Sequence, residues 1–513
     1  MKKFITILLA LAMILTLTLP AFATNATLTI TDTDRTYVGY KLLNLTTSLK
    51  TEQHPAACTD GQENGKHVDG CYNYAYSVNA KYKDILQAQA GGREIITYLS
   101  SLTGDNNTAT LRPAADAIYR AILKYNETAA QDEKLLPDYN PDERETTTQT
   151  QEIEQGYWLF ADVSDLQDGE NANSLVMVDT AGLAGVTINP KTALPTVEKK
   201  VKDDEANTPN WQDSADYDIG DEVPFKLKGT LPANLSSYET YSIIFHDTLS
   251  AGFTYNDNAV VKVGDADVTA KFTITSSPNN DGTTTLTIEC ADVLHGNIPG
   301  VNKNTLFEVF YSADLNEKAK IGPEGNPNEV YLEYSNDPYG NSTGKTKEDR
   351  VKVFTYELVI NKIDGVTQDP LAGAKFTLSR KIADDDYELV TTFTTNDTKT
   401  SFIWKGLDAG EYRLEETDPP AGYNKLDAPI YITITARHDI ESANPTLTEL
   451  TSTKGTADVT SGVITETIKN NTGSVLPETG AKGTMWLIFG GAALVMVAAV
   501  FMITRKKMSV FED

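Results

Sequence analysis

Three polar residues in the last third of the chain have types and positions suited to nucleophilic chemistry at an amide. Side chains two residues apart in a strand share one face. Each of the three is aligned in this way with apolar residues: Lys362 with Leu358 and Ile360, Glu416 with Tyr412 and Leu414, and Asn470 with Ile468. Burial lowers the pKa of an amine and raises that of a carboxylic acid. A buried lysine can then act as a neutral nucleophile, while a protonated acid polarises an asparagine amide and shuttles protons.

The segment around Glu416 resembles a known motif. Residues 412–423 read YRLEETDPPAGY and are similar to the E-box of collagen-adhesin B-type domains, Y-x-L-x-E-T-x-A-P-x-G-Y, with Pro419 in place of the alanine. The resemblance implies a spontaneous isopeptide bond between Lys362 and Asn470 that Glu416 promotes, with Asn471 as the rival amide. The alternative is a surface lysine, a salt-bridged glutamate and a capping asparagine.

A second set of candidates lies in the middle of the chain, which resembles the related A-type, or fimbrial D2, domain. Strand alternation aligns Lys199 with Val197 and Val201, whereas Lys200 should face solvent. In this reading Asp247 is the acid, and the amide is Asn328, with Asn336 as the second choice. The alternative is a sandwich without a cross-link.

A lysine that could join one subunit to the next ends the first domain. Residues 186–191 read VTINPK and resemble the pilin motif of pilus backbone subunits, whose core is Tyr-Pro-Lys; Asn189 stands in place of the tyrosine, and no tryptophan lies upstream at the family spacing. Pro190 fixes an extended backbone and removes one backbone N–H donor, which leaves the Lys191 side chain accessible at the domain edge. The resemblance implies that the Lys191 amine attacks the sortase-bound threonine of the next subunit. The alternatives are a solvated linker lysine, or linkage through Lys200 or Lys202.

The C-terminal end has the order of features of a cell-wall sorting signal. The pentapeptide consists of Leu476, Pro477, Glu478, Thr479 and Gly480. An apolar segment, 485–504, follows and is long enough to span a bilayer, and the basic tail, 505–513, should stay cytoplasmic. The resemblance implies that a sortase cysteine cuts between Thr479 and Gly480 and passes the threonine carbonyl to an amine. The alternative is an ordinary tail anchor.

The N-terminal end is typical of a secretory signal peptide, which we expect to cover residues 1–23. Lys2 and Lys3 precede an apolar run from Phe4 to Leu19, and Ala21 and Ala23 form an A-x-A exit. The run is short for a membrane helix, and no stop-transfer pattern follows it.

Composition excludes some functions. The net charge of −28 argues against nucleic acid as a partner.

Cys58 and Cys71 could close a small disulfide loop in an exported protein. The alternatives are two free thiols or a zinc site with His54 and His67, although the spacing of these residues fits no common zinc pattern. Cys290 is expected in a core. The five histidines are scattered, so we predict no enzyme active site. The sequence assigns no cofactor and no metal ligands, and whether the chain binds a metal stays open.

The elements that position these residues are mainly strands. Residues 24–191 mix strand patterns with helical spacing over Asn79–Leu102 and Arg112–Tyr125, and 127–152 reads as a polar loop. Residues 195–350 and 356–472 show short strands separated by Asn-, Asp- and Gly-rich turns. We therefore predict a mainly β fold of tandem immunoglobulin-like β-sandwiches, the first domain with added helices.

Taken together, the chain resembles the backbone subunits of sortase-assembled pili of Gram-positive bacteria. The resemblance implies an exported protein anchored covalently to the cell wall, polymerised head to tail from Thr479 to Lys191. Its partners would be a pilin-class sortase, a housekeeping sortase, other copies of the chain, minor pilins and peptidoglycan. Host ligands, and the choice between shaft and minor subunit, stay open. The alternative is a monomeric wall-anchored adhesin with the same domains.

Overall fold

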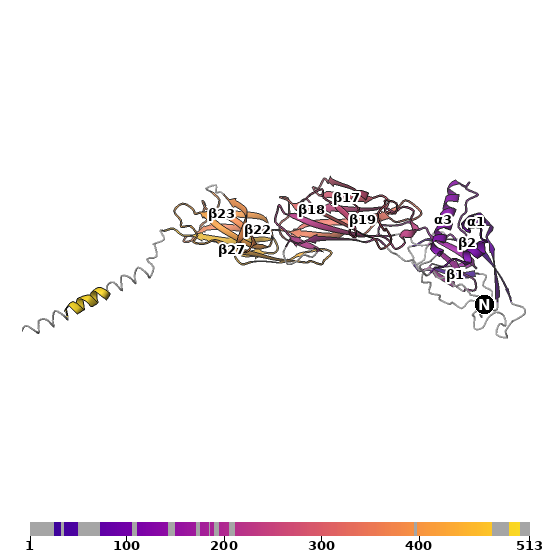
Figure 1. The fold of residues 1–513 in the computed structure, drawn as a ribbon, viewed down its shortest axis with the longest axis horizontal. Coiled ribbons are helices and arrows are strands. Elements are labelled where there is room, and N and C mark those ends of the chain that lie inside the picture. Colours follow the sequence, from indigo (N-terminus) through magenta and orange to yellow (C-terminus); the bar gives the residue numbers. More distant parts are fainter. Residues whose placement is uncertain are drawn as a thin grey trace, which may run out of the picture.

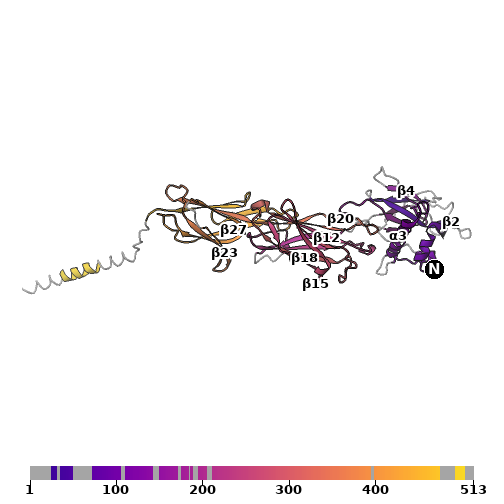
Figure 2. The ribbon, with the colours of Figure 1, turned by 90° about the horizontal axis from the view of Figure 1, so that it is seen from above.

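The computed structural model describes residues 25–31, 35–49, 72–104, 110–141, 149–170, 175–183, 185–188, 194–204, 211–393, 398–473 and 492–502. Three β-rich parts follow one another along the long axis in sequence order (Figures 1 and 2). The prediction of a mainly β protein with tandem domains, the first carrying helices, is confirmed.

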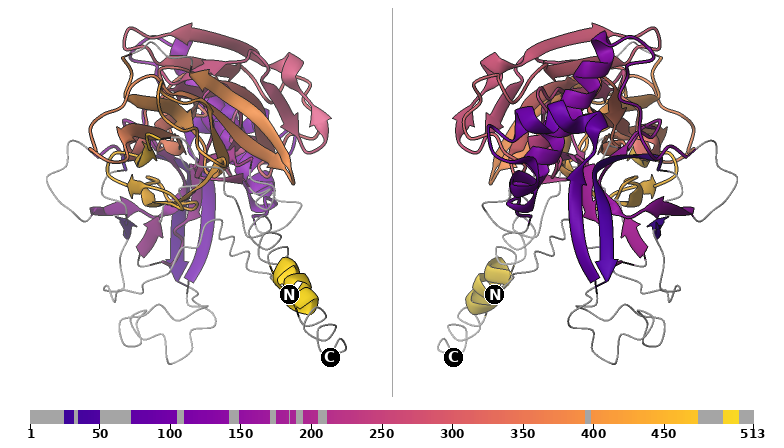
Figure 3. Two further views of the ribbon diagram at one scale, coloured as in Figure 1. Left: turned by 90° about the vertical axis from the view of Figure 1, so that its left-hand side faces the viewer. Right: turned by 90° about the vertical axis from the view of Figure 1, so that its right-hand side faces the viewer.

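Within its described residues, the N-terminal part contains two sheets, with strand orders β4-β1-β7 and β3-β2-β5-β6. Its elements are β1 (Asn25–Ile30), β2 (Tyr37–Leu49), β3 (Tyr72–Val78), η2 (Ala80–Tyr82), α1 (Lys83–Gln89), α2 (Ile95–Ser100), α3 (Leu111–Thr128), β4 (Gln149–Glu154), β5 (Gly156–Asp162), β6 (Leu175–Asp179) and β7 (Gly185–Ile188). The apolar side of the helices packs on the β3-β2-β5-β6 sheet in one core that includes Leu86, Ile118 and Leu159. Figure 3 looks along the long axis and shows these helices grouped beside the long strands.

One expectation for this part was wrong in detail, and another takes a more specific form. The helical spacing over Asn79–Leu102 corresponds to two separate helices, α1 and α2; Gly91 and Gly92 between them have φ of 59° and 84°, a left-handed backbone that glycine adopts readily. The predicted loop 127–152 contains the start of β4, which lies at a sheet edge and pairs antiparallel with β1. Among the described side chains of this strand, residues 150–154, only Ile153 is buried, so the strand lacks the apolar alternation that would reveal it in the sequence.

The middle part is a β-sandwich. Among the residues described, each of its two sheets has seven strands: β10-β21-β19-β12-β17-β16 with β20 on β19, and β15-β14-β18-β11-β8-β9 with β13 on β18. The elements are β8 (Val197–Lys202), β9 (Trp211–Gln212), β10 (Ser214–Asp216), β11 (Glu222–Thr230), η3 (Leu235–Ser237), β12 (Ile243–Leu249), β13 (Phe253–Tyr255), β14 (Val260–Val263), β15 (Ala266–Asp267), η4 (Thr269–Lys271), β16 (Thr273–Pro278), β17 (Thr284–Cys290), β18 (Leu306–Leu315), η5 (Gly322–Glu324), β19 (Asn326–Ser335), β20 (Thr343–Lys345) and β21 (Asp349–Phe354). Strand β21 runs beyond residue 350, the end that we expected for this domain.

The last part is a smaller sandwich with sheet orders β25-β22-β30-β29 and β24-β23-β26-β27-β28. Its strands are β22 (Tyr356–Asp364), β23 (Lys375–Ala383), β24 (Asp386–Phe393), β25 (Ser401–Leu407), β26 (Gly410–Asp418), β27 (Ile430–His438), β28 (Leu447–Ser452), β29 (Thr456–Asp458) and β30 (Val463–Asn470). The first strand, β22, and the last, β30, pair in parallel. Their alternating burial places every second side chain in the core between the two sheets.

Residues 492–502 form a helix beyond the last sandwich. No helix within the described ranges is long and apolar enough to cross a membrane. The rest of the predicted segment 485–504, the signal peptide 1–23 and the tail 505–513 lie outside the described residues.

Candidate cross-linking sites

The core of the last sandwich brings Lys362, Glu416 and Asn470 together. All three are buried, with 0%, 1% and 2% of their surface exposed. Lys362 on β22 pairs with Ile468 on β30, so Asn470 lies two residues farther along the neighbouring strand and on the same face. Glu416 reaches them from β26 of the opposite sheet. The Asn470 Nδ2 group donates to both oxygens of Glu416, at 2.9 and 3.0 Å.

The electrostatics of this site favour an uncharged amine. Burial lowers the pKa of Lys362 from 10.5 to about 8, against the opposing effect of the Glu416 and Asp364 charges. Its Nζ donates to the Ile468 carbonyl at 3.2 Å. The buried Asn470 Oδ1 has no hydrogen-bond partner among the described residues. Asn471, the rival amide, is exposed.

The middle sandwich holds a second set of the same chemistry between its two sheets. Lys199 comes from β8 of one sheet, and Asp247 on β12 and Asn328 on β19 come from the other. All three are fully buried. The Lys199 Nζ donates to Asp247 Oδ2 and to the Tyr311 hydroxyl at 2.9 Å. That hydroxyl donates to Asp247 Oδ1 at 2.8 Å and accepts from Asn328 Nδ2 at 2.8 Å.

Burial opposes charge on both members of the Lys199–Asp247 pair. Burial lowers the pKa of Lys199 and raises that of Asp247, and the attraction between the two works against both shifts. Transfer of one proton from lysine to aspartate therefore gives a neutral amine beside a neutral acid, the pair that attack on an amide needs. The buried Asn328 Oδ1 has no hydrogen-bond partner in the described part of the chain.

The neighbouring alternatives in the middle sandwich lie elsewhere. Lys200 is part-exposed and pairs with Asp213 at 2.5 Å and with Glu198 at 3.7 Å. Asn336 is buried, but its Oδ1 accepts from the Ser342 hydroxyl at 2.6 Å. Neither residue contacts Asp247 through a hydrogen bond or ion pair within the described structure.

Tyr311 is a member of the site that sequence reasoning missed. It lies within the buried alternation of β18, after Phe307 and Val309 and before Ala313 and Leu315. A tyrosine at such a position reads as an ordinary core aromatic, although its hydroxyl needs a buried partner. The need of a buried tyrosine hydroxyl for a hydrogen-bond partner is the signal that could have pointed to Tyr311.

Several predicted residues lie outside the described residues: Cys58, Cys71, Lys191 and the pentapeptide 476–480. Strand β7 ends at Ile188 and β8 begins at Val197, so Lys191 belongs to the segment between the first two parts. Cys290 is a free, buried cysteine, as expected.

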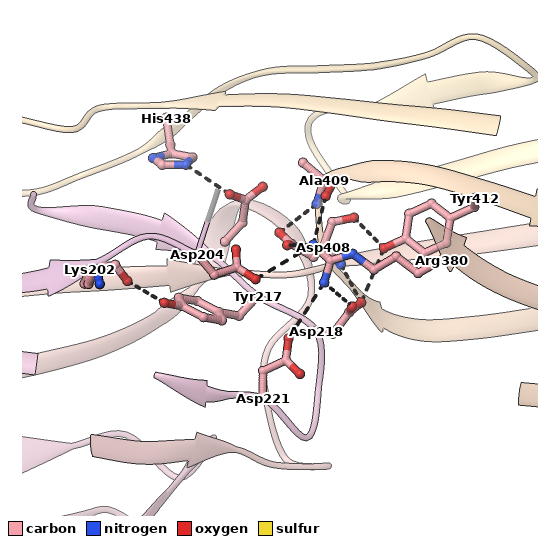
Figure 4. Close-up of polar contacts among 11 residues, drawn as sticks. Lys202, Asp204, Tyr217, Asp218, Asp221, Arg380, Asp408, Ala409, Tyr412 and His438 are labelled. Atoms are coloured by element: carbon pink, nitrogen blue, oxygen red, sulfur yellow. Dashed lines mark hydrogen bonds and ion pairs between the residues drawn. The ribbon is translucent and has the colours of Figure 1, made fainter. Parts of the chain in front are cut away.

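The junction between the two sandwiches is a polar site that the sequence did not reveal (Figure 4). Arg380 of the last sandwich pairs with Asp218 of the middle one at 2.7 Å and with Asp408 of its own sandwich. Asp408 is 1% exposed, and burial raises its pKa well above the ordinary range, with Asp216 adding to the effect and Arg380 opposing it. The Asp408 backbone N–H donates to Asp218 at 2.8 Å. These contacts join the two sandwiches end to end.

Family models match three stretches of the chain. Residues 219–338 match the Gram-positive pilin backbone subunit 2, Cna-B-like domain. Residues 356–446 match the SpaA prealbumin-like fold domain, and residues 468–509 match the LPXTG cell wall anchor motif.

Among curated proteins, the trypsin-resistant surface T6 protein of Streptococcus pyogenes serotype M6 is 26% identical over 404 residues, 63% of this chain and 71% of that protein. Among solved structures, the T6 backbone pilin of the same organism has a TM-score of 0.50 at 18% identity and covers 88% of this chain and 99% of its own. The major pilin SpaD of Corynebacterium diphtheriae has a TM-score of 0.46 at 16% identity, with 88% and 98% covered.

A row of β-sandwiches that ends in a wall-anchor motif defines a fibrous surface protein attached to the cell wall. The matched domains are those of Gram-positive pilin backbone subunits, and the chain is a structural component of a sortase-assembled pilus. The predicted family, function class and cell-wall location are thereby confirmed.

Proposed function

We propose that a pilin-class sortase joins Thr479 of one subunit to Lys191 of the next. The sortase cysteine breaks the Thr479–Gly480 bond and holds the threonine carbonyl as a thioester. The Lys191 amine then attacks, an amide forms, the cysteine leaves and one proton is released. A housekeeping sortase passes the final subunit to peptidoglycan by the same chemistry, and minor pilins complete the fibre.

The arrangement of the three parts supports this linkage. Lys191 lies in the segment between the first part and the middle sandwich, while Thr479 follows the end of β30 in the last sandwich. The parts form a row (Figure 2), so the two linkage positions are separated by both sandwiches. Joining them produces a shaft in which each repeat contains two sandwiches in line.

Within each sandwich we propose an amide bond between lysine and asparagine, Lys199 to Asn328 and Lys362 to Asn470. The neutral Nζ attacks the amide carbon, a carbon–nitrogen bond forms, and the original one breaks with loss of ammonia. In the middle sandwich the neutral Asp247 acid delivers its proton to the leaving nitrogen and takes one from the attacking amine; in the last sandwich Glu416 carries a proton from the attacking amine to the leaving nitrogen. The observation that carries this proposal is that each buried set unites the three groups from three different strands.

These bonds would resist tension along the fibre. The bond in the last sandwich ties its first strand, β22, to its last, β30, and the bond in the middle sandwich ties β8 to β19 across the two sheets. A cross-link removes extended conformations from the unfolded chain. Pulling on the ends then loads covalent bonds rather than hydrogen bonds.

The polymerisation proposal is tested on a denaturing gel of wall extracts probed for this protein. Wild type should give a ladder of high mass, and Lys191→Arg should remove the ladder. Lys200→Arg and Lys202→Arg are matched controls and should keep it. A ladder that survives in Lys191→Arg would contradict linkage through Lys191, and a single wall-released band in wild type would identify a monomeric adhesin instead.

A further inference from the structure

Three metal-ligand side chains converge where the two sandwiches meet. Asp203 follows β8, Asp216 ends β10, and His438 ends β27 of the other sandwich. One ligand atom of each lies within 4.8 Å of the others. Asp203 is 6% and Asp216 3% exposed, and the His438 side chain is 8% exposed. Figure 4 shows the His438 ring at this junction, on the side away from Asp221.

The hydrogen bonds of Ser214 fix the proton on the His438 ring. The Ser214 hydroxyl donates its single hydrogen to the Asp439 carbonyl at 2.6 Å. It must therefore accept from His438 Nδ1, which lies 2.7 Å away. With Nδ1 protonated, the lone pair of a neutral ring at Nε2 faces Asp216 Oδ1 at 3.4 Å. Two acceptors do not attract each other, so this position calls for a proton or a metal cation between or beside them.

The two aspartates beside the His438 ring carry more negative charge than one proton on the ring would neutralise. Asp203 and Asp216 are both buried at the site, with 6% and 3% of their surface exposed. Asp216 Oδ2 is buried and makes no well-formed hydrogen bond within the described part of the molecule, although the buried Tyr356 hydroxyl lies close enough to interact with the Asp216 carboxylate. A buried carboxylate oxygen without a partner is costly. The nearby Arg380 pairs with Asp218 and Asp408 rather than with this group.

We propose that Asp203, Asp216 and His438 bind a divalent transition cation of the Zn²⁺ or Mn²⁺ class. One imidazole nitrogen with carboxylate oxygens suits these ions, whereas Ca²⁺ and Mg²⁺ favour oxygen ligands alone. Metal–ligand bonds of roughly 2.0–2.2 Å place ligand atoms about 3–4 Å apart, so a small rotation of the side chains closes the site. The Ser214 hydroxyl holds the outer nitrogen of the ring, the usual second partner of a metal-bound histidine.

Such a cation would fasten the last sandwich to the middle one. The two aspartates belong to the middle sandwich and the histidine belongs to the last one. Two hydrogen bonds already join the sandwiches nearby: the Asp213 N–H donates to the Ile440 carbonyl at 2.8 Å, and the Ser442 N–H donates to the Asp213 carboxylate at 2.8 Å. The cation adds a further tie between the sandwiches and limits bending of each repeat. This proposal is independent of the Lys–Asn bonds and of Lys191.

The test is calorimetric titration of the chain spanning residues 24–479, stripped with EDTA, with zinc chloride, manganese chloride and calcium chloride in turn. We expect one site for zinc or manganese with a dissociation constant in the micromolar range or tighter, and a higher temperature of unfolding with the metal. His438→Gln should weaken binding about 100-fold or more, and Ser214→Ala, which keeps all three ligands, about 10-fold.

Two matched controls exclude adventitious surface binding. His295 is exposed and pairs with Asp292 at 2.7 Å, and His246 pairs with Glu333 at 3.0 Å; His295→Gln and His246→Gln should leave the affinity unchanged. Absence of zinc and manganese binding by the wild-type chain would overturn the proposal, and would assign the ring to a His438–Asp216 ion pair. Binding that His438→Gln and Ser214→Ala leave unchanged would overturn it as well.

Discussion

The amide nitrogen of Asn470 lies 2.9 and 3.0 Å from the two carboxylate oxygens of Glu416, in the closed core of the last sandwich. Glu416 therefore contacts the nitrogen that departs if Lys362 attacks this amide. The Asn470 Oδ1 has no hydrogen-bond partner among the described residues, and the Lys362 amine lies on the neighbouring strand and the same face. The site thus holds an amine, an amide and a carboxylate in one buried place, as the proposed Lys362–Asn470 bond requires.

Removing the amide should destabilise the last sandwich. In Asn470→Ala the tie between β22 and β30 cannot form, and a tie that closes a loop of roughly 100 residues contributes about 5 kcal/mol by the chain-entropy estimate. We expect the free energy of unfolding, measured by denaturant titration, to fall by about this amount. Asn471→Ala removes the exposed neighbouring amide and should leave stability within about 0.5 kcal/mol of wild type. Equal stability of the two variants would contradict the assignment of Asn470.

The Tyr311 hydroxyl should speed bond formation in the middle sandwich. It contacts Lys199, Asp247 and Asn328 at once. Tyr311→Phe removes these contacts but keeps the ring, so we expect the Lys199–Asn328 bond to form about 10-fold more slowly, since a lost hydrogen bond to a charged group costs about 1.5 kcal/mol or more. The measurement is mass spectrometry of pulse-labelled chains.

Tyr255→Phe is the matched control for that measurement. The Tyr255 ring packs edge-on against Tyr311 at 5.8 Å, but its hydroxyl accepts from the Ala259 N–H at 3.1 Å instead. Its rate should stay at the wild-type value. If both variants slow the reaction equally, the effect comes from packing and not from the Tyr311 hydroxyl.

The lowered pKa of Lys362 predicts a pH dependence. In Asn470→Ala the amine stays free, with a pKa of about 8 in the folded chain against 10.5 when unfolded. The unfolded state then binds more protons between these values, so stability rises with pH across this window. Below about pH 8 the penalty for charging the buried amine is fully present. Denaturant titrations across the window should show this rise, and it should vanish in Asn470→Ala/Lys362→Met. If the free energy of unfolding depends on pH in the same way in Asn470→Ala and in Asn470→Ala/Lys362→Met, the lowered pKa of Lys362 is refuted.

Arg380 should hold the junction between the sandwiches together. Arg380→Gln leaves the buried Asp408 beside Asp218 without its cation. Loss of one partner of a buried pair costs about 3–5 kcal/mol, and we expect this cost in denaturant titration. Asp408→Asn added to Arg380→Gln should recover part of it. Arg413→Gln is the control, because Arg413 lies over the Tyr387 ring, 4.5 Å from its centroid, away from the junction. No difference between the two arginine variants would argue against a role for the junction.

Strand alternation explains which parts of the sites could be predicted from the sequence. Lys199, Lys362 and Asn470 each follow regular apolar positions, so the period of two shows which way they point, and the structure buries all three. The same rule fails for β4, an edge strand in which one of the described side chains, Ile153, is buried. It also misses Tyr311, which looks like any core aromatic. The Arg380–Asp218 pair joins residues 162 apart, and no local pattern links positions across two domains.

The most direct test is the intact mass of the chain spanning residues 24–479, compared with the mass of its sequence. Two Lys–Asn bonds predict a mass lower by two molecules of ammonia. The Lys199→Arg chain should be lighter than its own sequence by one ammonia only, the one lost in the last sandwich. The control, Lys200→Arg, should still be lighter by two. A wild-type mass equal to that of the sequence would contradict both cross-links, and with them the account of how this subunit withstands tension.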